Sequence, residues 1–258
     1  MTTIHPTAIV DAGAELGTDV TVGAFSILHD DVVVGDGCQL GPHVTLLPGT
    51  RLGRNVTVHQ GAVLGGQPQD LKFAGEKTLL EVGDGTTLRE YVTLNRGTSA
   101  LGKTVVGRNC FLMAYVHVAH DCIIHDNVII SNAVQMAGHV EIDEYTGVGG
   151  LTAIHQFVHI GKHVFIGGGL RVGKDVPPFV LAMGEPLRYG GPNSVGLSRK
   201  GFSMDQIADI KRAYKILYRS NLTVREAVAA MQSDFADSPH VGEILNFIER
   251  SERGMIRD

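Results

Sequence analysis

The sequence has no tryptophan, only three cysteines and no long apolar run. Aromatic residues make up 6% of the chain, so small aliphatic side chains must build the core, which favours a regular stacked architecture. Few cysteines in a chain of this length fit a reducing compartment. The first residues, MTTIHPTAIVD, lack the cationic and apolar regions of a signal peptide, and no apolar run reaches the about 18 residues of a membrane span. We therefore expect a cytoplasmic protein without a transmembrane segment.

The charge of the chain also excludes one class of partner. The formal net charge is -5 at pH 7, which argues against wholesale binding of nucleic acid. Hydrophobic residues make up 43% of the 258 residues, and glycine contributes 33 of them. This composition fits one large globular domain, or one domain with an appendage.

A six-residue repeat runs through most of the chain. Aliphatic residues recur at every sixth position from Ile4 to Leu64, from Val82 to Leu94 and from Val106 to Val172, all in one phase. A small or β-branched side chain stands four residues after each of these positions, and all three cysteines occupy that second position. We expect the cysteines to be small buried fillers rather than nucleophiles or ligands.

This period predicts a parallel β-helix. Each hexapeptide contains a short strand with two inward side chains and then a turn, where glycine, asparagine and aspartate tolerate the required dihedral angles. Three strands close a triangular coil of about 18 residues, and the coils stack about 4.8 Å apart. The repeat is interrupted at 65–81 and 97–104. We expect both stretches to project from the coils as loops.

A second, helical domain is predicted after the repeat. The six-residue period stops at Val172, and two capping-box patterns, SMDQ and TVRE, then precede amphipathic stretches. A last helix is expected to begin near Ser238. We predict an all-β domain over 1–189, with the projecting loop 65–81, and a small α-helical domain over 190–258.

Histidine is concentrated between residues 117 and 163. With about 18 residues per coil, positions 18 apart stack, which places Gly138 above His120 and His139 above Asp121. One edge of the prism is therefore predicted to present a cluster of polar groups: His117, His120, Asp121, Gly138, His139, His155 and Gln156.

Two kinds of chemistry fit this cluster. In the first, His120 is a general base oriented by Asp121, and an amide beside Gly138 stabilises an oxyanion, which is acyl transfer to a hydroxyl. In the second, His120 and His125 form an H-x4-H spacing that resembles the zinc-binding γ-class carbonic anhydrases. That class needs another histidine two coils below, where a uniform count gives Asp84. We favour acyl transfer and expect no metal.

The sequence resembles the acyl-[acyl-carrier-protein]–UDP-N-acetylglucosamine O-acyltransferase family over nearly its whole length. The resemblance rests on VHVAHDCIIHDNVIISNAVQMAGHVEIDEYTGVGGLTAIHQFVHIG, QPQDLKFAGE, KDVPPFVLAMGEP and RKGFSMDQIADIKRAYKILYRS. It implies a left-handed β-helix, against the usual right-handed crossover, and a homotrimer with active sites between subunits. It also implies transfer of a 3-hydroxyacyl chain from acyl carrier protein to the glucosamine 3-hydroxyl of UDP-N-acetylglucosamine. This is the first step of lipid A biosynthesis, and it needs no cofactor beyond the carrier's phosphopantetheine.

The resemblance further implies the site residues. His120 matches the general base, Asp121 the residue that supports it, and Gly138 the glycine whose amide faces the oxyanion. Gly168 matches the position that measures the acyl chain. The substrate-contacting positions are matched by Gln69, Asp70, Lys72, His117, His139, His155, Gln156, Asn193 and Arg199.

Some positions depart from the family pattern. Val195 stands where glutamate is frequent, and Lys200 stands where a second arginine is frequent. Lysine cannot make a bidentate phosphate contact, so recognition of the uridine diphosphate must differ in detail. Gly168 leaves the acyl groove open and favours a longer chain, whereas Phe165 and Leu170 nearby would shorten it.

A local group of basic residues stands against the acidic net charge of the chain. Such a group can steer an acidic partner electrostatically, and we expect it to dock acyl carrier protein. The group consists of Lys162, Arg171, Lys174, Lys211, Arg212, Lys215 and Arg219.

Two other functions stay open on the sequence. One is a β-helical binding protein that keeps the fold without the chemistry. The other is the N-acyltransferase that acts later in the same pathway. That enzyme typically has an extra N-terminal domain, for which a repeat beginning at Ile4 leaves no room.

Overall fold

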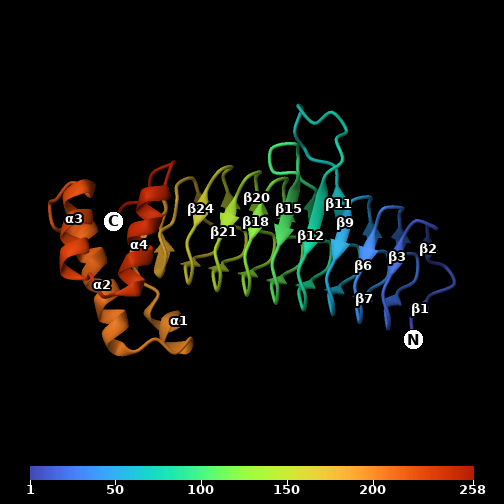
Figure 1. The fold of residues 1–258 in the computed structure, drawn as a ribbon, viewed down its shortest axis with the longest axis horizontal. Helices are drawn as coiled ribbons and strands as arrows, with labels where there is room; N and C mark the ends of the chain where they lie inside the picture. Colours follow the sequence, from blue (N-terminus) through green and yellow to red (C-terminus); the bar gives the residue numbers. More distant parts are fainter.

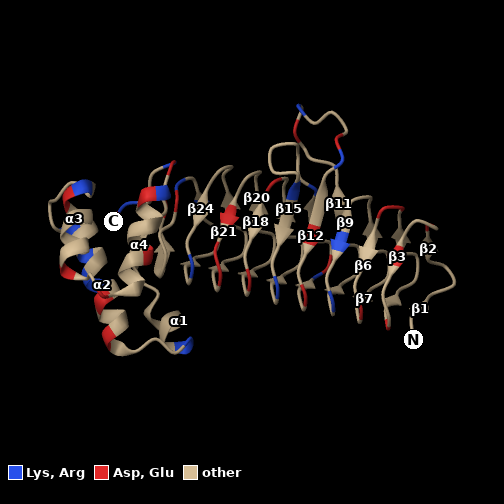
Figure 2. Cartoon of the chain, viewed as in Figure 1, with Lys and Arg blue, Asp and Glu red and all other residues tan.

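The computed structural model describes residues 1–258 and shows an elongated prism of stacked coils with helices at one end (Figure 1). The short strands wind as the predicted left-handed parallel β-helix. The N-terminus lies at the end of the prism opposite the helices (Figure 1). Acidic and basic residues are interspersed along the coils and helices rather than separated by sign (Figure 2).

Each face of the prism is one sheet, and all strand pairs are parallel except the last. The first sheet contains β1 (Thr3–Ile4), β4 (Thr21–Val22), β7 (Gln39–Leu40), β10 (Thr57–Val58), β13 (Thr87–Leu88), β16 (Phe111–Leu112), β19 (Ile129–Ile130), β22 (Gly147–Val148), β25 (Phe165–Ile166), β27 (Val180–Met183) and β28 (Arg188–Pro192). The second contains β2 (Ile9–Val10), β5 (Ile27–Leu28), β8 (Thr45–Leu46), β11 (Val63–Gly66), β14 (Thr93–Asn95), β17 (His117–Val118), β20 (Gln135–Met136), β23 (Ala153–Ile154) and β26 (Arg171–Val172). The third contains β3 (Glu15–Leu16), β6 (Val33–Val34), β9 (Thr50–Leu52), β12 (Leu79–Val82), β15 (Lys103–Val106), β18 (Ile123–Ile124), β21 (Glu141–Ile142) and β24 (His159–Ile160).

The core fills the inside of the prism with the aliphatic residues of the repeat. The second residue of a typical strand points inward, as in β19, where Ile130 is fully buried and Ile129 is 49% exposed. The three cysteines are buried and free, which confirms their role as fillers. Burial raises the pKa of the Cys122 thiol to about 12, so this thiol stays protonated and cannot act as a nucleophile.

The corners of the prism place one residue per hexapeptide in the left-handed backbone region. Asp121, His139 and Phe157 occupy this position on three successive coils, with φ angles of 58°, 61° and 63°. We expected glycine, asparagine and aspartate at the turns, yet many corners carry larger side chains. The left-handed conformation costs such residues about 1–3 kcal/mol each, and stacking between coils offsets part of it. Ring centroids lie 4.6 Å apart for His139 and Phe157 and 5.2 Å apart for Tyr91 and Tyr115.

The two interruptions of the repeat are insertions, and each one lengthens the coil in which it lies. The first loop lies between β11 and β12, and across it Thr57 pairs with Thr87 instead of with a residue 18 positions on. The second loop lies between β14 and β15, and across it Thr93 pairs with His117. The longer first loop projects from the coils, as predicted, and the second lies beside it (Figure 1).

One stacking prediction fails because of the second insertion. A uniform count placed Asp84 two coils below His120, and this was wrong. Asp84 follows β12 at the corner between the third and first sheets, whereas His120 lies between β17 and β18 at the corner between the second and third sheets. The insertion adds residues to one coil, so a constant period does not hold across it.

The chain becomes helical after β28. The helices are α1 (Ser194–Arg199), α2 (Met204–Arg219), α3 (Val224–Asp234) and α4 (Pro239–Arg250), and both capping boxes in front of α2 and α3 are formed. The domain boundary that we drew between 189 and 190 falls inside β28, which pairs antiparallel with β27 and extends the first sheet. None of the four helices combines the length and apolarity that a bilayer crossing requires.

The inward and outward residues of one strand provide a test of the core. We expect Ile130→Ala to lower the free energy of unfolding by about 2–5 kcal/mol, because it removes a fully buried side chain. Its neighbour Ile129 is 49% exposed, and Ile129→Ala should cost much less. Urea unfolding of the two variants measures the difference, and equal losses would contradict the inward placement of Ile130.

Candidate active site

A buried histidine–aspartate pair lies at the corner between the second and third sheets. His120 and Asp121 connect β17 to β18, and Nδ1 of His120 lies 2.8 Å from Oδ2 of Asp121. The His120 side chain is 13% exposed and the Asp121 side chain is fully buried. Nε2 of His120 has no hydrogen-bond partner within the chain. The imidazole is therefore held at one nitrogen and free to react at the other.

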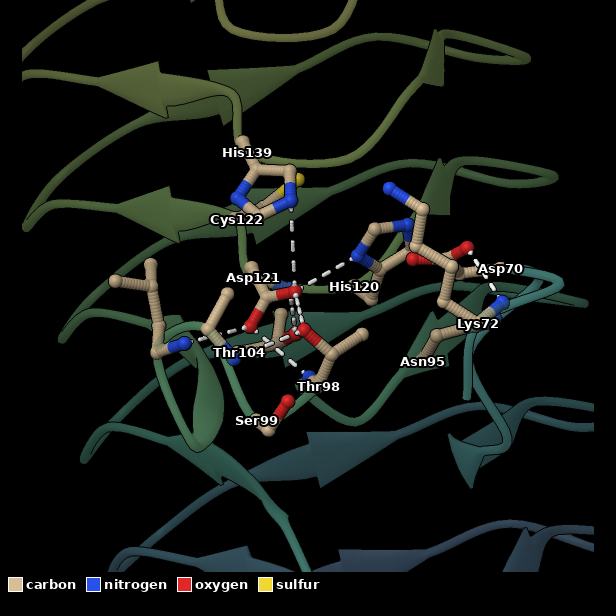
Figure 3. Close-up of polar contacts among 12 residues, drawn as sticks. Asp70, Lys72, Asn95, Thr98, Ser99, Thr104, His120, Asp121, Cys122 and His139 are labelled. Atoms are coloured by element: carbon tan, nitrogen blue, oxygen red, sulfur yellow. Dashed lines mark hydrogen bonds and ion pairs between the residues drawn. The ribbon is translucent and has the colours of Figure 1, made fainter. Parts of the chain in front are cut away.

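The second loop holds the Asp121 carboxylate (Figure 3). The backbone N–H of Thr98 donates to Oδ1 at 2.9 Å, and the Thr98 hydroxyl donates to Oδ2 at 2.7 Å. The N–H of Leu101 donates to Oδ1 at 3.3 Å, while the N–H of Asp121 itself donates to the hydroxyl oxygen of Thr104 at 2.8 Å. Sequence reasoning missed Thr98 and Thr104, although the repeat breaks at this stretch. The second insertion therefore supplies the hydrogen bonds that hold Asp121 beside His120.

The surroundings of Asp121 keep it ionised. Burial acts to raise the pKa of the Asp121 carboxyl, but the hydrogen bonds with His120 and Thr98 outweigh it and leave the pKa below its usual value. An ionised Asp121 accepts the proton of Nδ1, which leaves the lone pair of His120 on Nε2. His139 is a second neighbour, with its Nε2 3.7 Å from Oδ2 of Asp121. Burial lowers the pKa of His139, so this imidazole is mainly neutral at pH 7.

Gly138 lies against the His120 ring, as the stacking predicted. A Cβ atom at this position would come within 2.6 Å of Cε1 and 2.7 Å of Nε2 of His120. Gly138 is buried, and its N–H donates to no acceptor in the chain. A buried amide donor without a partner, beside the free nitrogen of an imidazole, can stabilise a negative oxygen that forms there.

The other members of the predicted cluster lie on the same corner or the adjoining second sheet. On β17, Nδ1 of His117 lies 2.8 Å from the hydroxyl oxygen of Thr93, and burial lowers the pKa of His117. His155 and Gln156 are exposed on the coil above Gly138. Nδ1 of His155 lies 3.1 Å from the carbonyl oxygen of Gln156. The structure thus brings the predicted cluster to one edge of the prism.

Residues of the first loop reach the same edge. Asp70 and Lys72 lie beside His120 on the side away from the second loop (Figure 3). The N–H of Lys72 donates to Oδ1 of Asp70 at 3.0 Å, and Asp70 contributes to the electrostatic surroundings of His139. Gln69 is exposed on the same loop.

Asn193 and Arg199 lie on another face. They line a cavity of about 630 Å³ against the first sheet, together with Val195 and Lys200. Nδ2 of Asn193 donates to the carbonyl oxygen of His163 at 3.0 Å, and Oδ1 caps α1 by accepting from the N–H of Gly196 at 3.2 Å. Within one chain these residues do not meet the cluster at His120.

The predicted acyl-chain position also lies away from His120. Gly168 connects β25 to β26 at the corner between the first and second sheets, where an added Cβ would approach the carbonyl oxygen of Gly150 at 3.0 Å. Phe165 belongs to β25 and lines the cavity on the first sheet, whereas Leu170 packs partly buried against the core. The expected effect of these two side chains on acyl length stays a prediction.

Comparison with protein families agrees with the fold. A family model described as bacterial transferase hexapeptide (six repeats) matches residues 31–66 and 103–138. A second model, described as UDP N-acetylglucosamine O-acyltransferase, domain 2, matches residues 175–256. The triangular coils, the buried histidine–aspartate pair and these matches define a hexapeptide-repeat acyltransferase.

Individual relatives narrow this class to one family. The acyl-[acyl-carrier-protein]–UDP-N-acetylglucosamine O-acyltransferases of Thiobacillus denitrificans and Herminiimonas arsenicoxydans are 50% and 49% identical to this chain, and each match covers 100% of both sequences. The crystal structure of the UDP-N-acetylglucosamine acyltransferase from Bacteroides fragilis superposes with a TM-score of 0.97 at 42% identity, over 98% of this chain and 99% of that one. The Campylobacter jejuni structure gives 0.93 at 34% identity, over 99% and 100%. The chain belongs to the acyl-[acyl-carrier-protein]–UDP-N-acetylglucosamine O-acyltransferase family, as the resemblance indicated.

The loop that holds Asp121 can be tested by one isosteric substitution. We expect Thr98→Val to lower kcat about tenfold or more with little change in KM, because the hydroxyl that anchors Asp121 is lost and His120 is less well positioned. The matched control is Ser99→Ala on the same loop, since the exposed Ser99 hydroxyl makes no hydrogen bond. Steady-state acyl transfer by both variants measures the effect, and equal behaviour would contradict the role of Thr98.

Proposed function

We propose that the protein transfers a 3-hydroxyacyl group from acyl carrier protein to the glucosamine 3-hydroxyl of UDP-N-acetylglucosamine, in the cytoplasm. This is the first step of lipid A biosynthesis. Membership of the family over the full chain supports the reaction. The observation that carries the chemistry is the free Nε2 of His120, which lies against Gly138, a buried residue with an unpaired N–H, while Asp121 holds the opposite ring nitrogen.

The reaction follows from these three groups. Nε2 of His120 takes the proton from the sugar 3-hydroxyl as that oxygen attacks the thioester carbonyl carbon. The carbonyl oxygen becomes negative in the tetrahedral intermediate, and the Gly138 N–H donates to it. The carbon–sulfur bond then breaks, and the protonated His120 returns its proton to the leaving thiolate. Asp121 stabilises the imidazolium between these steps. No cofactor is needed, because the acyl group arrives already activated on the carrier.

The remaining predicted residues would hold the substrates. Asp70 and Lys72 on the first loop and His139 lie beside His120 (Figure 3), which supports their role as contacts of a sugar nucleotide, and Gln69 on the same loop is proposed as a further contact. Further contacts are proposed for His117, His155 and Gln156 on the same edge. Gly168 stays the proposed determinant of acyl length, at the far side of the second sheet.

The face that carries Asn193 and Arg199 leads us to propose a homotrimer. These residues line a cavity on the first sheet, away from His120 of the same chain, so they complete a site at His120 of a neighbouring subunit. Arg199 offers a bidentate contact to phosphate, whereas Lys200 offers a point charge. Nζ of Lys200 lies 4.7 Å from the ring centroid of Tyr145, which limits its reach.

The proposed docking of acyl carrier protein rests on fewer basic residues than the sequence suggested. Lys162 pairs with Glu243 at 2.7 Å, Arg219 pairs with Asp258 at 2.9 Å, and Arg212 pairs with Asp209. The remaining four, which form no such pair, are Arg171, Lys174, Lys211 and Lys215. They are the proposed contacts of the acidic carrier, with attraction that weakens as salt rises.

Removal of the base tests the mechanism. We expect His120→Ala to lower kcat at least about a hundredfold, because general-base catalysis is worth roughly 10²–10⁴. The melting temperature should stay close to that of the wild type, since Thr98 and Leu101 still donate hydrogen bonds to Asp121. An acyl-transfer assay with UDP-N-acetylglucosamine measures the loss. Residual activity above about a tenth would contradict the role of His120. An inactive wild-type protein would favour the non-catalytic binding protein instead.

Mixed subunits test the position of the site between chains. His120→Ala and Arg199→Ala should each be nearly inactive alone, whereas co-refolded mixtures should regain activity at about a quarter of their sites. Those sites combine an intact His120 from one subunit with an intact Arg199 from the next. Mixing each variant only with itself is the control. Mixtures that stay inactive would place both residues in one chain's site and contradict the proposal.

A further inference from the structure

A second cluster of ionisable side chains lies on the third sheet, at a different corner from His120. His125 follows β18, Glu141 lies on β21, Asp143 follows β21 and His159 lies on β24. The ladder that aligns Ile123 with Glu141 and Glu141 with His159 brings the four side chains together from three successive coils. The acidic residue of β21 stands out on this face (Figure 2).

Three of these side chains turn ligand atoms toward one point. Nε2 of His125 lies 3.1 Å from Oε1 of Glu141 and 3.7 Å from Oδ1 of Asp143. All three atoms lie within 4.8 Å of one another. Bonds of about 2.0–2.1 Å to one tetrahedral metal ion separate its ligand atoms by about 3.3 Å. The two distances from His125 lie on either side of this value, so side-chain adjustment within the cluster can bring the three atoms around one ion.

The fourth side chain keeps the cluster in position. Nε2 of His159 lies 3.1 Å from Oδ2 of Asp143, the oxygen that does not face His125. The His159 ring packs against Phe247 of α4 with a centroid distance of 4.6 Å, and its backbone N–H donates to Asp175 at 2.9 Å. In metal sites, a carboxylate that binds the ion typically also accepts a hydrogen bond from a residue that does not bind the ion.

The charge and exposure of the cluster also suit a divalent cation. Glu141 and Asp143 together carry two negative charges, which one divalent ion neutralises. The side chains of His125, Glu141 and Asp143 are 38%, 37% and 15% exposed, so an ion can enter from solvent and keep water as a further ligand. One imidazole and two carboxylates are donors that first-row transition metals accept.

We propose that His125, Glu141 and Asp143 bind a divalent first-row transition metal ion such as Zn²⁺, with His159 as a positioning residue for Asp143. The site lies outside the acyl-transfer centre and does not depend on the proposed function. It differs from the H-x4-H site considered from the sequence, because His120 takes no part in it. Its metal links two successive coils of the third sheet, and His159 supports it from the next coil.

Zinc titration of the full-length protein after chelator treatment tests the site. Isothermal calorimetry should show one Zn²⁺ per chain in the wild type, and the ion should also raise the melting temperature. His125→Ala and Glu141→Gln should each weaken binding at least about tenfold, and His159→Gln should weaken it by a similar factor through Asp143. Acyl transfer by His125→Ala should equal that of the wild type.

Two control variants separate this site from other histidine–carboxylate pairs. His29→Ala removes an imidazole whose Nδ1 lies 3.6 Å from the single carboxylate of Asp11, and it should bind Zn²⁺ like the wild type. His120→Ala should do the same, although His120, Asp121 and His139 also converge. Loss of zinc only in His120→Ala would overturn the proposal. So would unchanged binding in His125→Ala and Glu141→Gln, or no binding by the wild type.

Discussion

The hydrogen bonding of each coil to the next is the constraint on which the rest of the structure depends. The N–H of His139 donates to the carbonyl oxygen of His120 at 3.0 Å, and the N–H of Phe157 donates to that of Gly138 at 3.2 Å. These bonds align residues of successive coils in columns. A group on one corner therefore meets the groups above and below it, and backbone register alone brings Gly138 to the His120 ring.

The pair of His120 and Asp121 also depends on a break in this regularity. A uniform coil would leave the corner below Asp121 as an ordinary turn, with no donors directed at a carboxylate. The insertion between β14 and β15 supplies two N–H groups and one hydroxyl to Asp121, which keeps a fully buried carboxylate ionised. A buried charge without such partners would be neutralised by a proton, and His120 would lose its orienting acceptor.

Different functional groups lie on different edges and faces of the prism. The corner between the second and third sheets carries the imidazole and the amide donor, the first sheet carries the cavity with Asn193 and Arg199, and the third sheet carries the cluster around Glu141. Because the coils are stiff, these sites cannot approach one another within a chain. The proposed acyl-transfer site with Asn193 and Arg199 therefore needs association of chains, whereas the cluster on the third sheet lies within one chain.

The coil could be predicted from the order of residues alone, since the six-residue period leaves only one alternation of inward and outward side chains. The same order predicts the stacking of Gly138 on His120, because both lie in an uninterrupted run of repeats, and the two capping boxes of the helices. The role of the two insertions could be seen only in the folded chain. A loop has no period, so neither the support of Asp121 by Thr98 nor the true corner of Asp84 could be counted. The contact of His125 with Glu141 was hidden for a related reason: it runs diagonally across two coils, 16 residues apart, where side-chain direction matters as much as spacing. The direct pairing of Glu141 with His159 follows the regular register.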